Sequence, residues 1–387
     1  MTDFNKVPDR RKFNNSIKWN VYPRDVLPMW VADMDFPAPK PILDGLHKAV
    51  NHGVLGYEMA MPPLKETVAA RMDKLYRWKV KPEAVVAVTG IVSGFSVAAR
   101  IACSSKKGVL IQTPVYNEFH EVKNNIGIPK LDAPLIKHVN GNIISYEIDW
   151  DIFETQVRKA GMFLLCNPHN PLGIIFSRED LLRMAEICIR NNVLIVSDEI
   201  HSELVLDDNK FMPMAKLSPE IAKHTITLVS PSKTFNVPGL FCGFAIITDK
   251  DLRARYEKEV GHQRMHVSSL GLYAAHTAFS GECDEWLKEL RAYLTGNRDF
   301  LVEYVTKYMP EVRTTIPDAT YLGWLDFSQT KIKGSPFEFF LKNAKVAASD
   351  GKIFGKGGED HIRLNFGTSR KLLKEGLDKM REALQAI

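Results

Sequence analysis

The stretch SPSKTFNVPGL, residues 230–240, guides the interpretation of the chain. It follows the apolar run at 226–229, so Lys233 is expected where a buried strand ends in a loop, the usual place for chemistry in an open α/β sheet. A partly desolvated lysine amine is a nucleophile that forms Schiff bases with aldehydes, most often that of pyridoxal phosphate. Taken alone, however, a lysine in such a turn is more often an ordinary surface residue.

The composition is that of a globular protein rather than a nucleic-acid-binding or membrane protein. The 387 residues suggest about two domains, and Lys and Arg (51) exceed Asp and Glu (46) without forming a basic stripe. The five cysteines are an odd number and contain no C-x-x-C pair, which fits a reducing, cytoplasmic compartment. Residues 1–20 lack the apolar core of a signal peptide, and no apolar run is long enough to span a membrane.

From residue 84 short β-branched runs alternate with helical stretches, which predicts an α/β fold. Strands are expected at 84–89, 109–112, 162–166, 193–196 and 226–229. The next run, 241–247, follows a loop of about eleven residues that has no room for a crossover helix, so this strand is expected to be antiparallel.

An N-terminal arm, a series of helices and a smaller C-terminal unit are also predicted. Residues 1–45 contain many prolines and predict an extended arm, in which 30–36 is expected to be a short edge strand. Helices are expected at 40–52, 64–78, 95–103, 177–191, 250–261, 268–279 and 284–308, the last long enough to bridge two domains. A smaller α+β unit should follow, with strands at 312–316, 321–326 and 361–366 and helices at 336–343 and from 371.

Polar side chains gather where the predicted strands end. A glycine turn at 90–94 between a strand and a helix would present backbone N–H groups, with Ser93 as N-cap, to an anion. Tyr116 follows the second strand, Asn170 lies in the stiff loop NPHNPLG, and Asp198 and His201 follow an apolar strand. Such crowding at the carboxyl ends of parallel strands suggests a site.

Taken in order, these motifs resemble the fold-type I pyridoxal-phosphate enzymes over essentially the full length of the chain. Within that group, WVADMDFP (30–37), NPHNPLG (167–173), SDEIHSEL (197–204), SPSKTFN (230–236) and IRLNFGTSR (362–370) are similar to the carbon–sulfur β-lyases of the MalY/PatB type. The resemblance implies a mostly parallel seven-stranded sheet with one antiparallel strand, plus a smaller α+β domain. It also implies three regions: residues 1–48 as an arm with part of the small domain, 49–285 as the large cofactor-binding domain, and 286–387 as the C-terminal small domain.

The resemblance assigns roles around the cofactor ring. Lys233 would form the Schiff base and then remove the substrate Cα proton, and Asp198 would pair with the pyridinium nitrogen. Asn170 and His201 would approach the ring hydroxyl, and Tyr116 would stack on the ring face as a catalytic neighbour of the lysine.

The cofactor phosphate would lie on the amides of Val92 and Ser93, with hydroxyls from Ser230 and Ser232. Family members often add a tyrosine from the neighbouring subunit, and Tyr57 fits that catalytic and cofactor-binding role, so a homodimer with shared sites is expected.

The substrate α-carboxylate would be held by Arg363, with Asn170 and Asp33 as further substrate-binding residues and no metal. The chain departs from the family in two places. Phe241 stands where many relatives carry a basic residue for the phosphate, and Ile174 and Ile175 stand where an arginine often follows the NPHNPxG loop.

These assignments imply β-elimination from sulfur amino acids, for example L-cystathionine to homocysteine, pyruvate and ammonia, or release of sulfide from cysteine. An aminotransferase is the first alternative, because the same lysine, aspartate and arginine serve either fate of the carbanion. The second is a cofactor-binding regulatory protein that acts through a partner.

Overall fold

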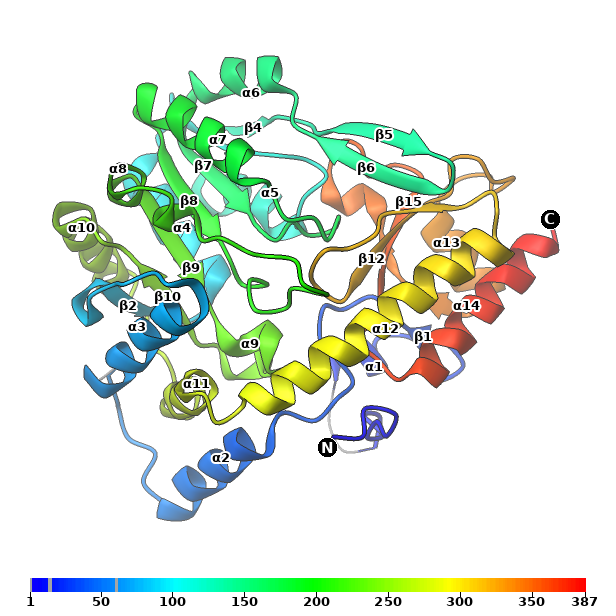
Figure 1. The fold of residues 1–387 in the computed structure, drawn as a ribbon, viewed down its shortest axis with the longest axis horizontal. Coiled ribbons are helices and arrows are strands. Elements are labelled where there is room, and N and C mark those ends of the chain that lie inside the picture. Colours follow the sequence, from blue (N-terminus) through cyan, green and yellow to red (C-terminus); the bar gives the residue numbers. More distant parts are fainter. Residues whose placement is uncertain (1, 13–15, 60–61) are drawn as a thin grey trace.

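The computed structural model describes residues 2–12, 16–59 and 62–387 (Figure 1). Residues 1, 13–15, 60 and 61 fall within the predicted arm and the predicted large domain and lie outside the described residues. The three-region division of the chain therefore stays a prediction.

Within the described residues, a seven-stranded sheet is the centre of the larger lobe, in the order β2-β10-β9-β8-β7-β3-β4. The strands are β2 (Val85–Val88), β3 (Gly108–Ile111), β4 (Lys130–Asp132), β7 (Ala160–Cys166), β8 (Leu194–Asp198), β9 (Thr225–Val229) and β10 (Gly243–Ile246). Only β10 runs antiparallel to its neighbours in this sheet. The predicted fold class, including the antiparallel strand at 241–247, is confirmed.

Both faces of this sheet are apolar, which is why its strands read as continuous hydrophobic runs. Successive side chains point to opposite faces. In β7, Met162 and Leu164 belong to one buried cluster, whereas Phe163 and Leu165 belong to another. Because both faces are buried in apolar clusters, polar side chains are expected at the ends of the strands.

The helices of the larger lobe surround the sheet, except α2, which projects from it and packs against α11 (Figure 1). They are α2 (Lys40–His52), α3 (Pro62–Tyr76), α4 (Ile91–Ala102), α5 (Asn117–Ile126), α6 (Trp150–Val157), α7 (Arg178–Arg190), α8 (Pro219–Lys223), α9 (Pro231–Thr234), α10 (Lys250–His262) and α11 (Ser269–Ser280). Short 3₁₀ helices lie at Pro82–Ala84, Met214–Lys216, Pro238–Leu240 and Gly351–Phe354. Ser177 caps α7 through Asp180 N, as the sequence predicted.

The predicted turn at 90–94 is wrong, because these residues already form the first turn of α4. Gly90 is the N-cap and its carbonyl accepts from Gly94 N at 2.9 Å, so Ser93 lies inside the helix and is not its cap. The amides of the first turn still face the carboxyl end of the sheet, where an anion would meet them.

A six-stranded sheet forms the smaller lobe, in the order β14-β15-β12-β11-β6-β5. Its strands are β5 (Ile136–Asn140), β6 (Ile143–Glu147), β11 (Arg313–Thr314), β12 (Leu322–Asp326), β14 (Ser349–Asp350) and β15 (His361–Asn365). The β5–β6 hairpin comes from the sequence between β4 and α6 and joins through Thr314 and Ile143. The sequence reading missed it, because its strands are short and largely exposed.

Three helices complete this lobe: α12 (Asp284–Tyr308), α13 (Pro336–Asn343) and α14 (Arg370–Gln385). The long helix α12, yellow in Figure 1, runs from the lobe of the seven-stranded sheet to the lobe of β12 and β15, as predicted for 284–308. No helix among the described residues has the length and apolarity needed to cross a membrane.

The N-terminal region before α2 is mostly irregular. It contains α1 (Ile17–Asn20) and β1 (Leu27–Pro28), which pairs with β13 (Val346–Ala347). Residues 30–36, here called the 30–36 segment, do not form the expected edge strand. The reason is that side chains, rather than a neighbouring strand, bond most of their carbonyls.

Gly173 closes the NPHNPLG loop and offers a direct test of the fold. Its φ is +75°, and an added Cβ would lie 2.5 Å from the Cβ of Pro317. Gly173→Ala should therefore lower the free energy of unfolding by about 2–3 kcal/mol, measured by urea denaturation. Gly127→Ala is the matched control, since Gly127 has φ +72° but open space around it, so only about 1 kcal/mol should be lost. Equal losses in the two variants would show that the Pro317 contact is unimportant.

Candidate active site

Lys233 lies where the sequence placed it, at the carboxyl end of β9. Ser230 caps the short helix α9 by accepting from Ser232 N, and Lys233 is in that helix. Its Nζ donates to the carbonyl oxygen of Ala32 at 2.7 Å. Burial, helped by the nearby Arg363 guanidinium, lowers the pKa of Lys233 to about 8, against the opposing charges of Asp33 and Asp198. A lysine with such a pKa is partly neutral near pH 7 and can act as nucleophile or base.

Asp198 and His201 present two buried polar groups from the end of β8. Asp198 is 4% exposed, and one of its oxygens accepts from Ile200 N at 3.1 Å. No ion pair involves it among the described residues, and burial raises its pKa to about 7. His201 is also buried, its Nδ1 has no hydrogen-bond partner in the described part of the chain, and burial lowers its pKa to about 3. A buried polar atom without a partner is rare, so His201 Nδ1 points to a ligand, and a buried carboxylate without a cation beside it points the same way.

Arg363, on β15, is a buried cation that no carboxylate neutralises among the described residues. Its Nη1 donates to Asn170 Oδ1 at 3.0 Å, and Nη2 donates to Trp30 O at 2.9 Å and Ser349 Oγ at 3.2 Å. Its Nε has no partner in the described structure, and its guanidinium carbon lies 5.0 Å from the centre of the Phe354 ring. Burial lowers the pKa of Arg363 to about 10. A desolvated guanidinium with a free N–H is suited to receive an anion such as a carboxylate.

Tyr116 joins the same group of residues from the residue before α5. Its side chain is partly buried, and this burial raises the pKa of its hydroxyl, so the phenol stays protonated. The charges of Arg363 and Asp198 are close enough to act on this pKa. The structure thus brings together Lys233, Asp198, His201, Asn170, Arg363 and Tyr116, from five separate stretches of sequence.

The start of helix α4 lies beside this group. Val92 and Ser93 are in the first turn of α4, whose N-cap, Gly90, would leave open space around an added Cβ. Gly243 of β10 lies between the start of α4 and the end of β9. A Cβ added at Gly243 would be 3.5 Å from Val229 O and 3.6 Å from Gly90 C. Helix N-termini next to open space are ready-made phosphate sites.

Two serines border that end of α4 from the start of α9. The hydroxyl of Ser230 donates to Cys242 O at 2.7 Å. The hydroxyl oxygens of Ser230 and Ser232 are 3.0 Å apart. Phe241 is 69% exposed, so the position that is often basic in the family holds an aromatic ring facing outward.

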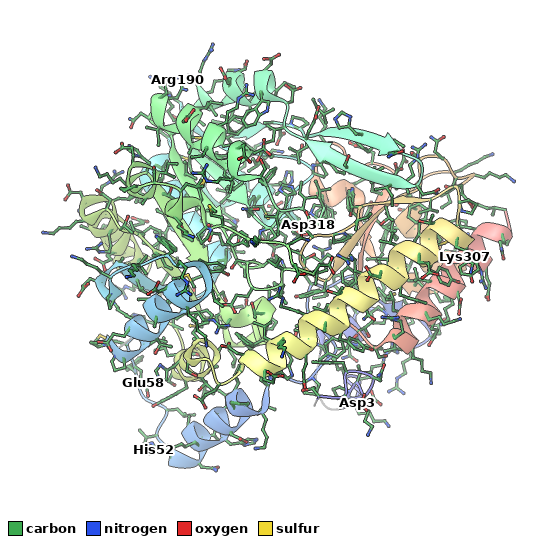
Figure 2. All side chains as sticks on the ribbon, in the orientation of Figure 1. Asp3, His52, Glu58, Arg190, Lys307 and Asp318 are labelled. Carbon is green, nitrogen blue, oxygen red and sulfur yellow. The ribbon has the colours of Figure 1, made fainter. Side chains whose placement is uncertain are left out.

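Asp33 and Tyr57 are placed differently from the other candidates. The Asp33 carboxylate is held by Arg10 at 2.6 and 3.0 Å, so it is not free for a substrate. Tyr57 is fully exposed on the stretch between α2 and α3. Figure 2 shows its neighbour Glu58 at the edge of the molecule, and no contact between Tyr57 and Lys233 is present in the described part of the chain.

The sequence reading missed the residues that build the floor of the site. Asn365 donates to Val31 O and Asp33 O, both at 2.6 Å, and Asn236 donates to Met34 O at 2.9 Å and Phe36 O at 2.7 Å. Tyr321 donates to Ala32 O at 2.9 Å. Asn236 lies in the motif SPSKTFN and Asn365 in IRLNFGTSR, so both could have been predicted from the sequence. No motif contains Tyr321.

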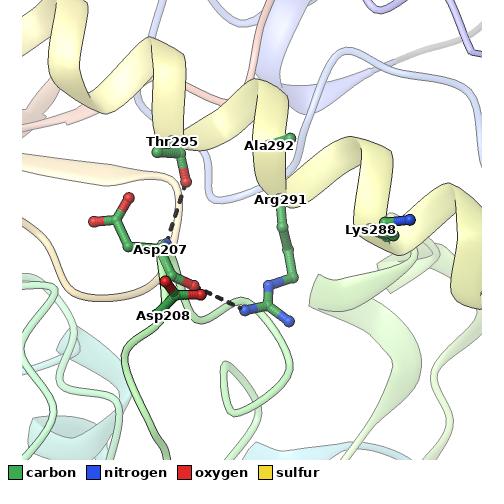
Figure 3. Close-up of a pocket in the computed structure, with 6 residues that line it drawn as sticks. All are labelled: Asp207, Asp208, Lys288, Arg291, Ala292 and Thr295. Carbon is green, nitrogen blue, oxygen red and sulfur yellow. Dashed lines mark hydrogen bonds between the residues drawn. The ribbon is translucent and has the colours of Figure 1, made fainter.

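A separate surface pocket of about 440 Å³ lies between α12 and the stretch at Asp207. Figure 3 shows Asp207, Asp208, Lys288, Arg291, Ala292 and Thr295 around it. None of the predicted site residues lines this pocket, so it is not the candidate site. The described residues also contain no cluster of His, Cys, Asp and Glu that would hold a metal ion.

Residues 47–380 match the family described as aminotransferase class I and II. The chain belongs to this family. It is 36% identical to cystathionine beta-lyase PatB of Bacillus subtilis over 386 residues, covering 97% of this chain and 98% of PatB. It is 28% identical to protein MalY of Escherichia coli, covering 100% of both chains. The resemblance drawn from the motifs is therefore confirmed.

Solved structures of this family give the same result for the fold. The PLP-bound C-S lyase from Staphylococcus hominis has a TM-score of 0.91 at 31% identity, covering 99% of this chain and 98% of the other. Cystalysin from Treponema denticola has a TM-score of 0.93 at 28% identity, covering 100% and 99%. The site described above thus sits in an aminotransferase fold.

Buried charges beneath the 30–36 segment hold it against this site. Lys18 is 1% exposed, and its Nζ lies 3.0 Å from Asp35 Oδ2 and donates to Asp33 O at 3.2 Å. Arg10 Nη1 donates to the other oxygen, Asp35 Oδ1, at 3.1 Å, and Trp19 Nε1 donates to Oδ1 at 2.9 Å. Despite burial, these partners, Lys18 first, keep the pKa of Asp35 below its ordinary value.

Lys18→Met should lower the free energy of unfolding by about 3 kcal/mol at pH 7, because it leaves Asp35 short of a buried cation. A carboxylate with a depressed pKa stabilises the fold above its unfolded pKa and loses that effect as pH falls, so the deficit should shrink below about pH 4. Urea unfolding across this pH range measures it. Lys12→Met is the control, since Lys12 pairs with Asp9 on the surface and should change stability little. A deficit that does not depend on pH would contradict the role of the pair.

Proposed function

We propose that this protein is a pyridoxal-phosphate-dependent carbon–sulfur β-lyase that acts on thioether amino acids, with L-cystathionine as the model substrate. The observation that carries the proposal is the uncompensated Arg363 guanidinium on the same site as Lys233 and Asp198. A buried cation for a carboxylate, a lysine with a lowered pKa and an unpaired buried carboxylate form a set that serves amino-acid chemistry on this cofactor. The family and the names of its relatives support the same choice.

The donor set fits pyridoxal phosphate. Asp198 would hold the ring nitrogen in its protonated form, which relieves the unfavourable burial of an unpaired carboxylate. Asn170 and the unpaired His201 Nδ1 would face the ring hydroxyl, and Tyr116 the ring itself. The phosphate would take the first turn of α4 with Ser230 and Ser232. When bound, this cofactor supplies an electron sink for the electron pair that remains on the substrate Cα after its proton is removed.

The residues of the chain orient the substrate and move its proton. Arg363, held by Asn170 and Ser349, would bind the α-carboxylate through its guanidinium, whose Nε has no partner among the described residues. Lys233, with its pKa lowered to about 8, would accept the Cα proton on Nζ. The thiolate would then leave from Cβ, and hydrolysis of the remaining fragment would give pyruvate and ammonia.

The decisive test is pyruvate release from L-cystathionine without any added keto acid. The wild-type protein should show a visible absorbance band from the bound cofactor and steady pyruvate formation. Lys233→Ala should lose the band and at least 10³-fold of the rate, because it removes both the attachment point and the base. The control is Lys12→Ala, an exposed lysine that pairs with Asp9, which should behave as wild type.

Each other outcome points to a different function. A band with amino transfer only after a keto acid is added would make the protein an aminotransferase. A band with no turnover on any thioether amino acid would favour a regulatory role through a partner. No band would remove the cofactor assignment itself.

We further propose a cytoplasmic homodimer in which Tyr57 completes the site of the partner subunit. The exposed stretch between α2 and α3 is apolar, with Val54, Leu55, Tyr57 and Met59 each more than half exposed. Such a patch on one chain is typical of an interface. The free cysteines, most of them buried, agree with a reducing compartment.

Mixing inactive variants tests this sharing. If Tyr57→Ala and Lys233→Ala homodimers are unfolded, combined and refolded, hybrids should regain activity, because one of their two sites has both native residues. Lys233→Ala refolded with a Lys233→Ala/Tyr57→Ala double variant is the control and should stay inactive. An inactive hybrid, shown to form by two different affinity tags, would place Tyr57 outside the partner's site.

A further inference from the structure

One backbone carbonyl, that of Ala32, links Lys233 to a residue that the proposed mechanism does not use. Ala32 O accepts from Lys233 Nζ at 2.7 Å and from the hydroxyl of Tyr321 at 2.9 Å. The two donors come from α9 in the larger lobe and from the residue just before β12 in the smaller lobe. They therefore share a single acceptor on the 30–36 segment.

Tyr321 is held so that its hydroxyl has little freedom. Its side chain is fully buried, and its ring lies edge-on to His201 with centroids 6.0 Å apart. Its backbone is fixed as well, since Tyr321 O accepts from Phe366 N at 2.8 Å. Burial raises the pKa of the phenol, so it remains a proton donor at every physiological pH.

The position of Ala32 is fixed on both sides of this contact. Arg363 donates to Trp30 O, and Asn365 donates to Val31 O and Asp33 O. The carbonyl therefore cannot follow the lysine if the amine moves. It acts as a fixed resting place for Lys233 Nζ, and a second donor on the same oxygen limits how strongly that place holds the amine.

We propose that Tyr321 is a positioning residue for Lys233, which acts through the shared Ala32 carbonyl to set where the free amine rests and how readily it leaves. The proposal deepens the proposed function, because it concerns the lysine that would attach the cofactor and move the Cα proton. A carbonyl oxygen that accepts one hydrogen bond from a phenol has less electron density to offer a second donor. Without Tyr321, the carbonyl would hold the ammonium form of Lys233 more tightly and keep it from acting as a base.

Other charges face Lys233 and must stay constant in any test. Arg363 from β15 disfavours its ammonium form, while Asp198 from β8 and Asp33 from the 30–36 segment favour it. The neutral ring of His201 also lies near Lys233. Tyr321→Phe changes none of these charges and removes only one hydroxyl.

The test uses the full-length chain stripped of cofactor, after circular dichroism and thermal unfolding have confirmed that each variant is folded. Competitive acetylation at a series of pH values, read by peptide mass spectrometry, gives the pKa of Lys233 directly. In Tyr321→Phe that pKa should rise by about 0.5 to 1 unit, the size expected for one altered hydrogen bond. Tyr304→Phe is the control, because this buried tyrosine bonds Asp378 on α14 and should leave Lys233 unchanged.

A second variant changes the hydrogen bond in the opposite direction. Placing 3-fluorotyrosine at position 321 keeps the hydroxyl but makes it a stronger donor, so the pKa of Lys233 should fall. In the loaded enzyme, Tyr321→Phe should lower kcat by about tenfold and leave KM within about twofold, as expected for a proton-transfer step rather than substrate binding. Its rate against pH should shift in the same direction as the lysine pKa.

A folded Tyr321→Phe chain with an unchanged or lowered Lys233 pKa would overturn the proposal, as would a fluorotyrosine variant with no downward shift. If Tyr321→Phe does not fold, the fluorotyrosine result alone decides. Failure of the proposed function would look different, because the chain would then bind no cofactor or release no pyruvate. The pKa measurement needs neither, so the two failures can be told apart.

Discussion

The structure depends on the hydrogen bonds that side chains make to the carbonyls of the 30–36 segment. Four side chains together donate to the carbonyls of residues 30–33. One is Lys233 from the larger lobe, and the others are Arg363, Asn365 and Tyr321 from the smaller lobe. The segment is therefore bonded to both lobes, as a strand shared by two sheets would be, although it is not a strand itself. Because buried carbonyls need partners, the site side chains and this backbone hold one another in place.

Electrostatics explains why these residues remain poised in an interior that disfavours charge. Arg363 and Asp198 are both buried, and neither has an ion-pair partner among the described residues. Isolated buried charges are costly, and in an ordinary core they would be paired or replaced. Their persistence, together with the lowered pKa of Lys233, is what separates a site for a charged ligand from a merely polar region of the core.

Much of the architecture was predictable because its elements follow strong local rules. Helices α2, α12 and α13 have the predicted bounds, and the short loop before β10 was enough to predict an antiparallel strand. The start of α4 was placed too late because Gly94 looked like part of a turn, whereas it lies inside the helix against Leu228. The β5–β6 hairpin was missed because exposed strands of five residues carry almost no hydrophobic signal.

The site was predictable only as far as its motifs carried chemistry. Lys233, Asp198 and Asn170 stand at or just after the ends of strands, and Arg363 lies within the strand predicted at 361–366, so the order of their motifs grouped these residues before the structure did. The bonds to the 30–36 segment could not be predicted in the same way, because each donor is up to 334 residues from its acceptor, and the acceptors are backbone oxygens, which every residue type has. Tyr321 shows the limit most clearly: its role follows from one shared oxygen atom, and no sequence pattern distinguishes its ring from any other buried aromatic.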